Sequence, residues 1–104
     1  MRFGTYLQPL FLIKMTEGEL ESFKQKIIET MSFPGVYMYK FIVQSENRNI
    51  ALVENLFDVG TDIHTKESGN GRYISITAKQ VVLSVDEVID IYKKAAEIKG
   101  IIFL

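Results

Sequence analysis

The stretch that decides the fold runs from Thr61 to Val82 and reads TDIHTKESGNGRYISITAKQVV. Its centre, Ser68-Gly69-Asn70-Gly71, is a strong turn signal, because an Asn-Gly pair readily adopts the positive φ angles of a tight hairpin. After the turn, Arg72 to Val82 alternates apolar and polar residues, and before it Thr61 to Lys66 predicts a short strand. The stretch therefore predicts a β-hairpin whose second strand has one buried and one exposed face.

Upstream, a β-rich run from Val36 to Val43 predicts a further strand. One set of alternate positions is aromatic or apolar, and the other set carries Lys40 in the middle of the strand. A lysine at mid-strand indicates that its face meets solvent, so the aromatic face is expected to meet the core. The first set comprises Tyr37, Tyr39, Phe41 and Val43, and the second comprises Met38, Lys40 and Ile42.

Apolar residues at helical spacing predict three helices. The first spans about residues 17–31 behind a capping box of Thr16 and Glu19, and the third opens with a second capping box, Ser84 to Glu87. The middle helix has Ser45 or Asn47 as its N-cap and ends at Gly60, while Gly100 ends the third. The predicted inward residues are Leu20, Phe23, Ile27, Ile28 and Met31, then Ile50, Val53, Leu56 and Phe57, then Val85, Val88, Ile89, Tyr92 and Ala96.

With a short apolar strand at Ile101 to Leu104, the order from residue 36 is strand, helix, strand, hairpin turn, strand, helix, strand. This order predicts an α+β fold, the ferredoxin-like βαββαβ split βαβ sandwich, with an extra N-terminal helix. Both main helices would pack on one face of an antiparallel sheet, leaving the other face to solvent, a partner or the extra helix. We expect residues 15–104 to form this single domain. Residues 1–14 are expected to be a poorly ordered extension or a mis-assigned start before Met15.

Composition excludes several classes of function. The 104 residues contain 12 Lys and Arg against 13 Asp and Glu, with one His and no Cys. This balance argues against a strongly basic nucleic-acid binder, and the lack of Cys excludes disulfides, thiolate nucleophiles and thiolate metal sites. The longest apolar runs are too short for a membrane helix. We therefore expect a cytoplasmic protein without metal or cofactor.

The candidates for catalysis are few. His64 is the side chain suited to general base chemistry at neutral pH, and Asp62 and Lys66 share its strand face. The alternative is a solvated edge strand, where charges discourage pairing with other sheets. As a metal pair, Asp62 and His64 lack a third ligand, and Ser75 lacks the sequence setting of an activated nucleophile. We expect a protein that is not an enzyme.

The exposed sheet face is the candidate binding surface, mildly basic and rich in hydroxyls with a single aromatic. We expect a non-enzymatic binding or regulatory module that acts through this face or through its apolar C-terminal edge strand, with a second copy or a protein partner. A weak RNA-binding module is the alternative, although RNA modules of this shape stack bases on several aromatics. Strand parity assigns to the face Lys40, His64, Lys66, Tyr73, Ser75, Thr77 and Lys79.

The chain contains the short motifs Phe33-Pro34, Tyr39-Lys40, Ser68 to Ile76, Val88 with Tyr92, and the apolar C-terminal residues Ile101 to Leu104. In their order and spacing, these motifs resemble the YbeD-like family (DUF493), small bacterial proteins catalogued as a domain of unknown function. The resemblance covers about residues 30–104. It implies a ferredoxin-like fold related in shape to the ACT regulatory domains, which bind amino acids and usually dimerise, and it implies no catalytic residues.

The ACT-like resemblance adds a third hypothesis, a small-ligand sensor. ACT domains use a glycine in the turn after their first strand to bring backbone close to a ligand, and this chain has Val43-Gln44-Ser45 there. That departure puts an amino-acid site of the ACT type in doubt.

Overall fold

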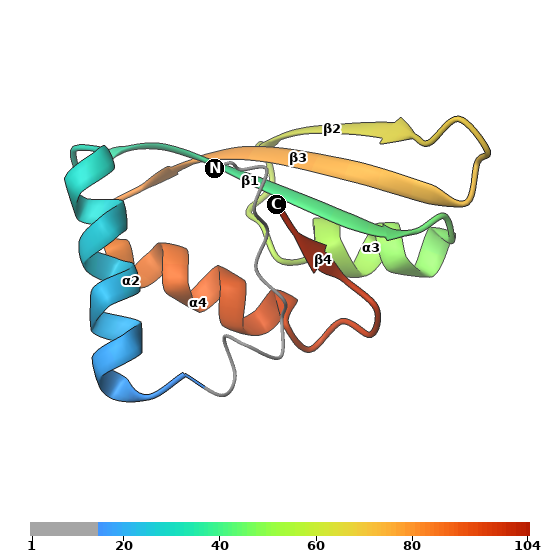
Figure 1. Cartoon of the computed structure of the whole chain (residues 1–104). Helices are drawn as coiled ribbons and strands as arrows, with labels where there is room; N and C mark the ends of the chain where they lie inside the picture. The colour runs from blue at the N-terminus through green and yellow to red at the C-terminus, as the bar shows by residue number, and fades with distance from the viewer. Residues whose placement is uncertain (1–14) are drawn as a thin grey trace.

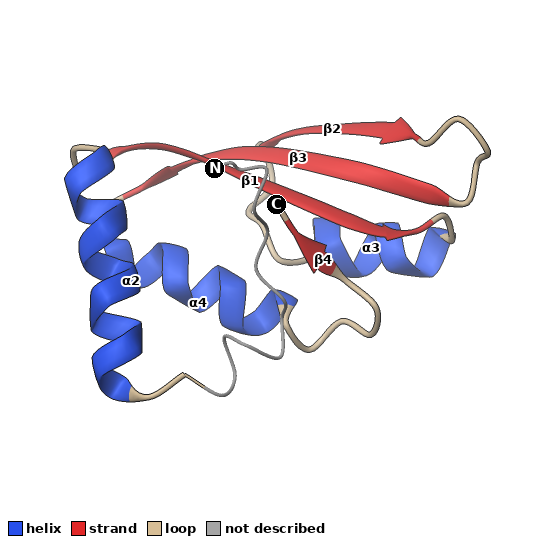
Figure 2. Ribbon diagram, in the orientation of Figure 1, coloured by secondary structure: helices blue, strands red, loops and turns tan. Residues whose placement is uncertain are grey.

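The computed structural model describes residues 15–104 and contains a four-stranded antiparallel sheet (Figure 1). The strand order is β2-β3-β1-β4, and the helices of the described residues, α2, α3 and α4, accompany the sheet (Figure 2). This arrangement confirms the ferredoxin-like α+β fold with an extra N-terminal helix, while the predictions for residues 1–14 lie outside the described residues. The elements are α2 (Glu17–Thr30), β1 (Gly35–Gln44), α3 (Asn47–Glu54), β2 (Asp62–Glu67), β3 (Tyr73–Val82), α4 (Val85–Ala95) and β4 (Ile102–Phe103).

All three described helices lie on the same side of the sheet (Figure 1). Helix α2 stands at one end and packs on α4, where the ring centroids of Phe23 and Tyr92 are 6.1 Å apart. The Lys24 ammonium lies 3.0 Å from an Asp86 carboxylate oxygen, and its hydrogen bond to Asp86 raises the pKa of Lys24. The sequence left the opposite face of the sheet to solvent, to a partner or to the extra N-terminal helix. The structure rules out the last of these, because α2 packs on α4 instead.

The aromatic face of β1 forms the centre of the core, as predicted. Tyr39, Phe41 and Val43 are buried, and Tyr92 of α4 packs its ring against the first two at centroid distances of 5.6 and 6.1 Å. Aromatic side chains bury large apolar areas, so the burial of this cluster stabilises the domain. Helix α4 also buries Ile91, which the predicted helical face omitted.

The helix ends test the capping predictions. Thr16 and Glu19 form the predicted capping box, with hydrogen bonds of 3.1 and 3.0 Å. The second box is wrong, because the Glu87 carboxylate accepts instead from the backbone N–H of Leu83, and the Ser84 side chain caps nothing.

The predicted bounds of α3 also need correction. Its N-cap is Glu46, rather than Ser45 or Asn47, because the first helical hydrogen bond runs from the Ile50 N–H to the Glu46 carbonyl. Helix α3 ends at Glu54, and Gly60 lies in a later turn with φ of 94°. Helix α4 likewise ends at Ala95, before Gly100 with φ of 79°. Both glycines serve the turns that re-enter the sheet, rather than the helix ends.

The predicted hairpin is present between β2 and β3, with a longer loop than a tight Asn-Gly turn. The Ser68 N–H donates to the Tyr73 carbonyl at 2.8 Å and closes a four-residue loop. Gly71 takes the positive φ, 72°, and donates to the Ser68 carbonyl. The Asn70 side-chain oxygen accepts from the Arg72 N–H and from the Ser68 hydroxyl. These two hydrogen bonds stabilise the loop in the way that Asn side chains commonly stabilise turns.

Candidate binding surface on the open sheet face

The sheet face opposite the helices is called the outer face here. Antiparallel partners point to the same face of a sheet, so the register assigns its members. Thr77 of β3 pairs with Lys40 of β1 and with His64 of β2, and Ser75 pairs with Lys66. The seven predicted residues therefore share one surface. The outer face comprises Val36, Met38, Lys40, Ile42 and Gln44, with Asp62, His64 and Lys66, with Tyr73, Ser75, Thr77, Lys79 and Val81, and with Ile102.

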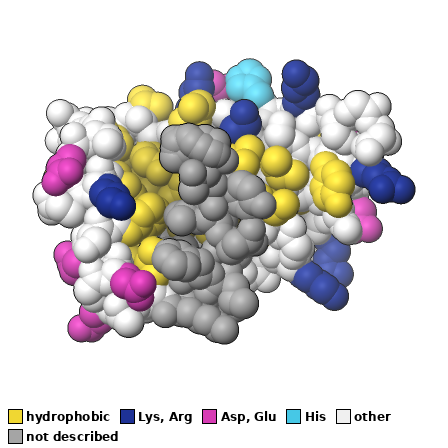
Figure 3. Space-filling model, in the orientation of Figure 1, with side chains coloured by type: hydrophobic (Ala, Val, Ile, Leu, Met, Phe, Trp, Pro, Cys, Tyr) yellow, Lys and Arg dark blue, Asp and Glu magenta, His cyan; other side chains and the backbone are white. Residues whose placement is uncertain are grey.

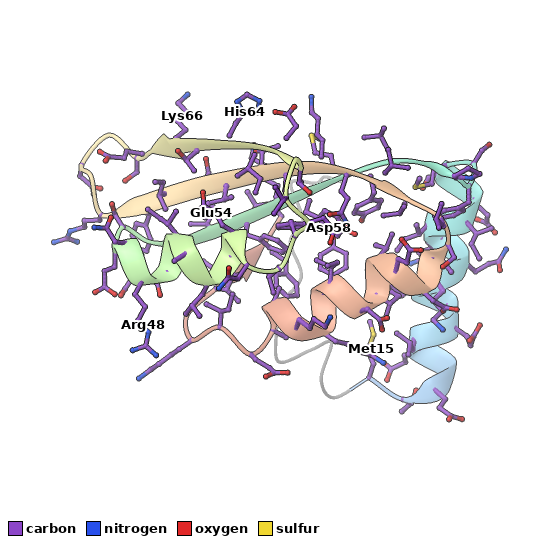
Figure 4. The ribbon with its side chains drawn as sticks, turned by 180° about the vertical axis from the view of Figure 1, so that it is seen from behind. Met15, Arg48, Glu54, Asp58, His64 and Lys66 are labelled. Carbon is purple, nitrogen blue, oxygen red and sulfur yellow. The ribbon has the colours of Figure 1, made fainter. Side chains whose placement is uncertain are left out.

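His64 and Lys66 point away from the helices (Figure 4). Asp62 and His64, which the sequence placed on one strand face, are in contact, since His64 Nε2 lies 2.8 Å from Asp62 Oδ1. Both side chains are well exposed, at 70% and 58%. No hydroxyl of the described residues hydrogen-bonds to His64. The contact fits an exposed ion pair on an edge strand when the imidazole is protonated.

One end of the outer face is apolar, a feature that the predicted site omitted. Val36 pairs directly with Val81, and Met38 follows on the same face of β1. These three side chains are 61%, 61% and 56% exposed, and Leu83, just beyond β3, is 68% exposed. We call these four residues the apolar end. The signal was present in the sequence, because Val36 and Val81 have the same strand parity as the predicted residues.

The middle of the outer face carries the charge. Lys40, Lys66 and Lys79 lie there, and Asp62 is the acidic residue that shares the face. The upper border of the space-filling view shows this polarity, with hydrophobic atoms toward the α2 end and basic side chains continuing past the histidine (Figure 3). Met38 pairs with Lys79, so the apolar end borders the lysines directly.

Two hollows lie away from the centre of the outer face. A groove of about 730 Å³ runs between α3 and the segment after α4, and residues lining it include Arg48, Leu52, Lys94 and Ile98. Arg48 extends from the helix side of the molecule, opposite His64 and Lys66 (Figure 4). A smaller hollow of about 350 Å³ lies where the β1–α3 turn meets the hairpin, beside Arg72 and Tyr73.

In an ACT domain, the turn after the first strand contains the glycine residue that brings the backbone close to the ligand. The corresponding turn in this chain follows β1. Here the Gln44 carbonyl accepts from the Glu46 N–H at 2.8 Å and from the Asn49 side chain at 3.1 Å. The Ser45 N–H is also occupied, by the Arg72 carbonyl. These backbone groups are committed to the protein itself, which agrees with the departure seen in the sequence.

The predicted C-terminal edge strand is present but short. β4 pairs with β1 through Phe41 and Ile42, and the Leu104 N–H adds a bond to the Lys40 carbonyl. Phe103 is buried in the core, whereas Ile102 lies on the outer face. Pairing of this edge with another chain stays a prediction.

Two further observations concern residues 15–104 alone. No group of three acidic or histidine side chains in this part of the chain is arranged to hold a metal ion. No helix among the described elements has the length and apolarity needed to cross a membrane.

The fold and the outer face define a small ferredoxin-like domain with one packed and one open sheet face. Residues 28–104 match the model of a family described as a protein of unknown function (DUF493), and the chain belongs to this family. The chain is also similar to a UPF0250 protein of Shewanella piezotolerans, with 29% identity over 80 residues that cover 73% of this chain and 91% of the relative. No solved structure matches significantly. The predicted family resemblance is thereby confirmed.

Proposed function

We propose that the protein is a non-enzymatic binding or regulatory module, and that its outer face is the surface through which it binds. The observation that carries this proposal is the apolar end, where neighbouring large apolar side chains are more than half exposed. Single exposed apolar residues are ordinary, but a contiguous patch bordered by polar residues is typical of an interaction site.

The packing of the domain supports the same proposal. The inner face of the sheet is covered by the helices and buries its aromatic residues. No described element covers the outer face (Figure 1). Because the register fixes the order of side chains on a sheet, this face can present a binding surface without the ordering cost that a loop would incur.

RNA is the less favoured partner. Tyr73 is the aromatic residue of the outer face, and it pairs with Gln44 at the end of the sheet away from Val36. Stacking of successive bases uses several aromatic rings near basic groups. The apolar end offers nothing to a phosphate backbone.

Photo-crosslinking in native lysate tests the proposal. A benzophenone amino acid replaces His64 on the outer face or, as the control, Lys26 on the exposed side of α2. We expect an adduct that depends on light and on the His64 position, and that weakens when Met38→Asp is added. Equal adducts from both positions, or none from the His64 position, would contradict the proposal. Protease and ribonuclease digestion then assign the class of the partner.

A further inference from the structure

We propose that the outer face binds an amphipathic acidic segment of a protein partner, with the apolar side chains of that segment on the apolar end and its carboxylates on the lysines. This inference rests on the proposed function and specifies the chemistry of the partner. It follows from the order in which apolar and basic side chains succeed one another along the sheet.

The apolar end supplies the contact area. Val36 and Val81 are directly opposed on neighbouring strands, and Met38 is the next outer-face residue of β1. Methionine adapts its shape to a partner because it is unbranched and polarizable. A partner that covers these side chains removes apolar surface from water, which favours binding.

The lysines set the charge of the partner. Within residues 15–104, the ion pairs involve Lys24 and His64, so Lys40, Lys66 and Lys79 have no carboxylate within 4.0 Å. Asp62 is already in contact with His64. The three ammonium groups are therefore available to carboxylates of a partner, and opposite charge speeds association and selects the partner.

The spacing sets the arrangement of the partner. Successive outer-face residues on one strand are about 6.6 Å apart, so Lys40 lies roughly 13 Å along β1 from Val36. A helix covers that distance in about nine residues. A helical segment along β1 would thus carry apolar residues over about two turns at one end and acidic residues in the adjoining turns.

The distribution of lysines and apolar residues on the outer face argues against a second copy of the chain and against RNA as the partner. A symmetric contact between two complete outer faces would set the lysines of one copy against those of the other. RNA would satisfy the lysines and leave the apolar end uncovered. A peptide with both apolar and acidic side chains can cover the apolar end and pair with the lysines.

Selection from a library of displayed random peptides tests the inference on the full-length protein. The peptides have roughly 16 residues, or about 24 Å as a helix. We expect enriched peptides that combine apolar residues at helical spacing with clustered Asp and Glu. Their affinity, measured by fluorescence polarisation, is expected to fall by roughly tenfold or more on Met38→Asp and on Lys79→Glu.

Two matched variants serve as controls. Val59→Asp alters a fully exposed residue in the α3–β2 loop, and Lys26→Glu alters an exposed lysine of α2. Both are expected to leave the affinity unchanged. Circular dichroism verifies that every variant is folded.

Three results would overturn the inference: no enrichment, enrichment of basic or uncharged peptides, or binding that survives Met38→Asp combined with Lys79→Glu. The crosslinking experiment separates this failure from failure of the proposed function. An adduct of the outer face with RNA or with a second copy would disprove the acidic segment and keep the outer face as the binding site. Absence of any adduct specific to the His64 position would disprove both.

Discussion

The core contains a buried polar group without a hydrogen-bond partner among the described residues, the hydroxyl of Tyr39. The Tyr39 side chain is fully buried. The hydroxyls of Tyr37 and Tyr92, in contrast, bond to each other at 2.9 Å. Burial raises the pKa of all three phenols, because the charged form loses solvation. The pKa of Tyr92 is raised well above its ordinary value.

Tyr39→Phe is expected to raise the free energy of unfolding by about 1 kcal/mol, since it removes a buried oxygen without a partner and keeps the ring. Tyr37→Phe is expected to lower it by about 1 kcal/mol, because the Tyr92 hydroxyl then loses its hydrogen bond. Urea denaturation measures both changes. A loss of stability in Tyr39→Phe would show that its hydroxyl is hydrogen-bonded in solution.

The raised phenol pKa values predict loss of stability in alkali. Well below pH 10, the tyrosines are protonated in both the folded and the unfolded chain, so they cause no dependence of stability on pH. Above pH 10, the unfolded chain releases protons that the folded chain retains, and the free energy of unfolding falls.

Thermal unfolding monitored at several pH values above neutrality measures this fall. Replacing Tyr92 by Phe should flatten the dependence, whereas Tyr73→Phe, on the exposed outer face, is the matched control. An equal slope in the two variants would contradict the assignment of the effect to the buried cluster.

The elements show where local sequence signals were sufficient. The hairpin and the Thr16 capping box involve residues within a few positions of one another, so their chemistry is readable in the sequence. The Ser84 box has the same pattern of residue types, yet Glu87 bonds to Leu83 instead. The path of the chain between β3 and α4 decided which amide the carboxylate reaches.

Gly71→Ala tests the hairpin loop. Gly71 has φ of 72°, and a Cβ at this position would make only an ordinary contact, 4.0 Å from Glu67 Oε2, so Gly71 is required for its backbone conformation and not for a close contact. The substitution is expected to lower the free energy of unfolding by about 1–2 kcal/mol. Gly69→Ala, in the same loop without a positive φ, is the control for chemical denaturation. Equal losses in the two variants would refute this explanation.

At the scale of the whole molecule, β3 lies between two strands, whereas β2 forms an edge of the described sheet. Every amide from Ile74 to Lys79 faces either β1 or β2. In β2, alternate amides face away from β3. Amide hydrogen exchange is therefore expected to show continuous protection along residues 74–79 and alternating protection along residues 62–67. Continuous protection along β2 would reveal a further strand bound at that edge.

The order of the elements, the buried face of β1, the hairpin and the set of predicted outer-face residues followed from the sequence itself. Alternation and helical periodicity are local properties, and they report which side of an element is apolar. The binding role predicted for those residues stays a proposal.

Only the tertiary structure decided that α2 packs on α4 rather than over the open face, and that Val36 and Val81 meet to form the apolar end. Those residues are 45 positions apart, and their contact depends on the pairing register of β1 and β3. A pattern within one strand predicts which face is exposed. The neighbours that complete a surface come from other strands, and their position is set by the packing of the whole chain.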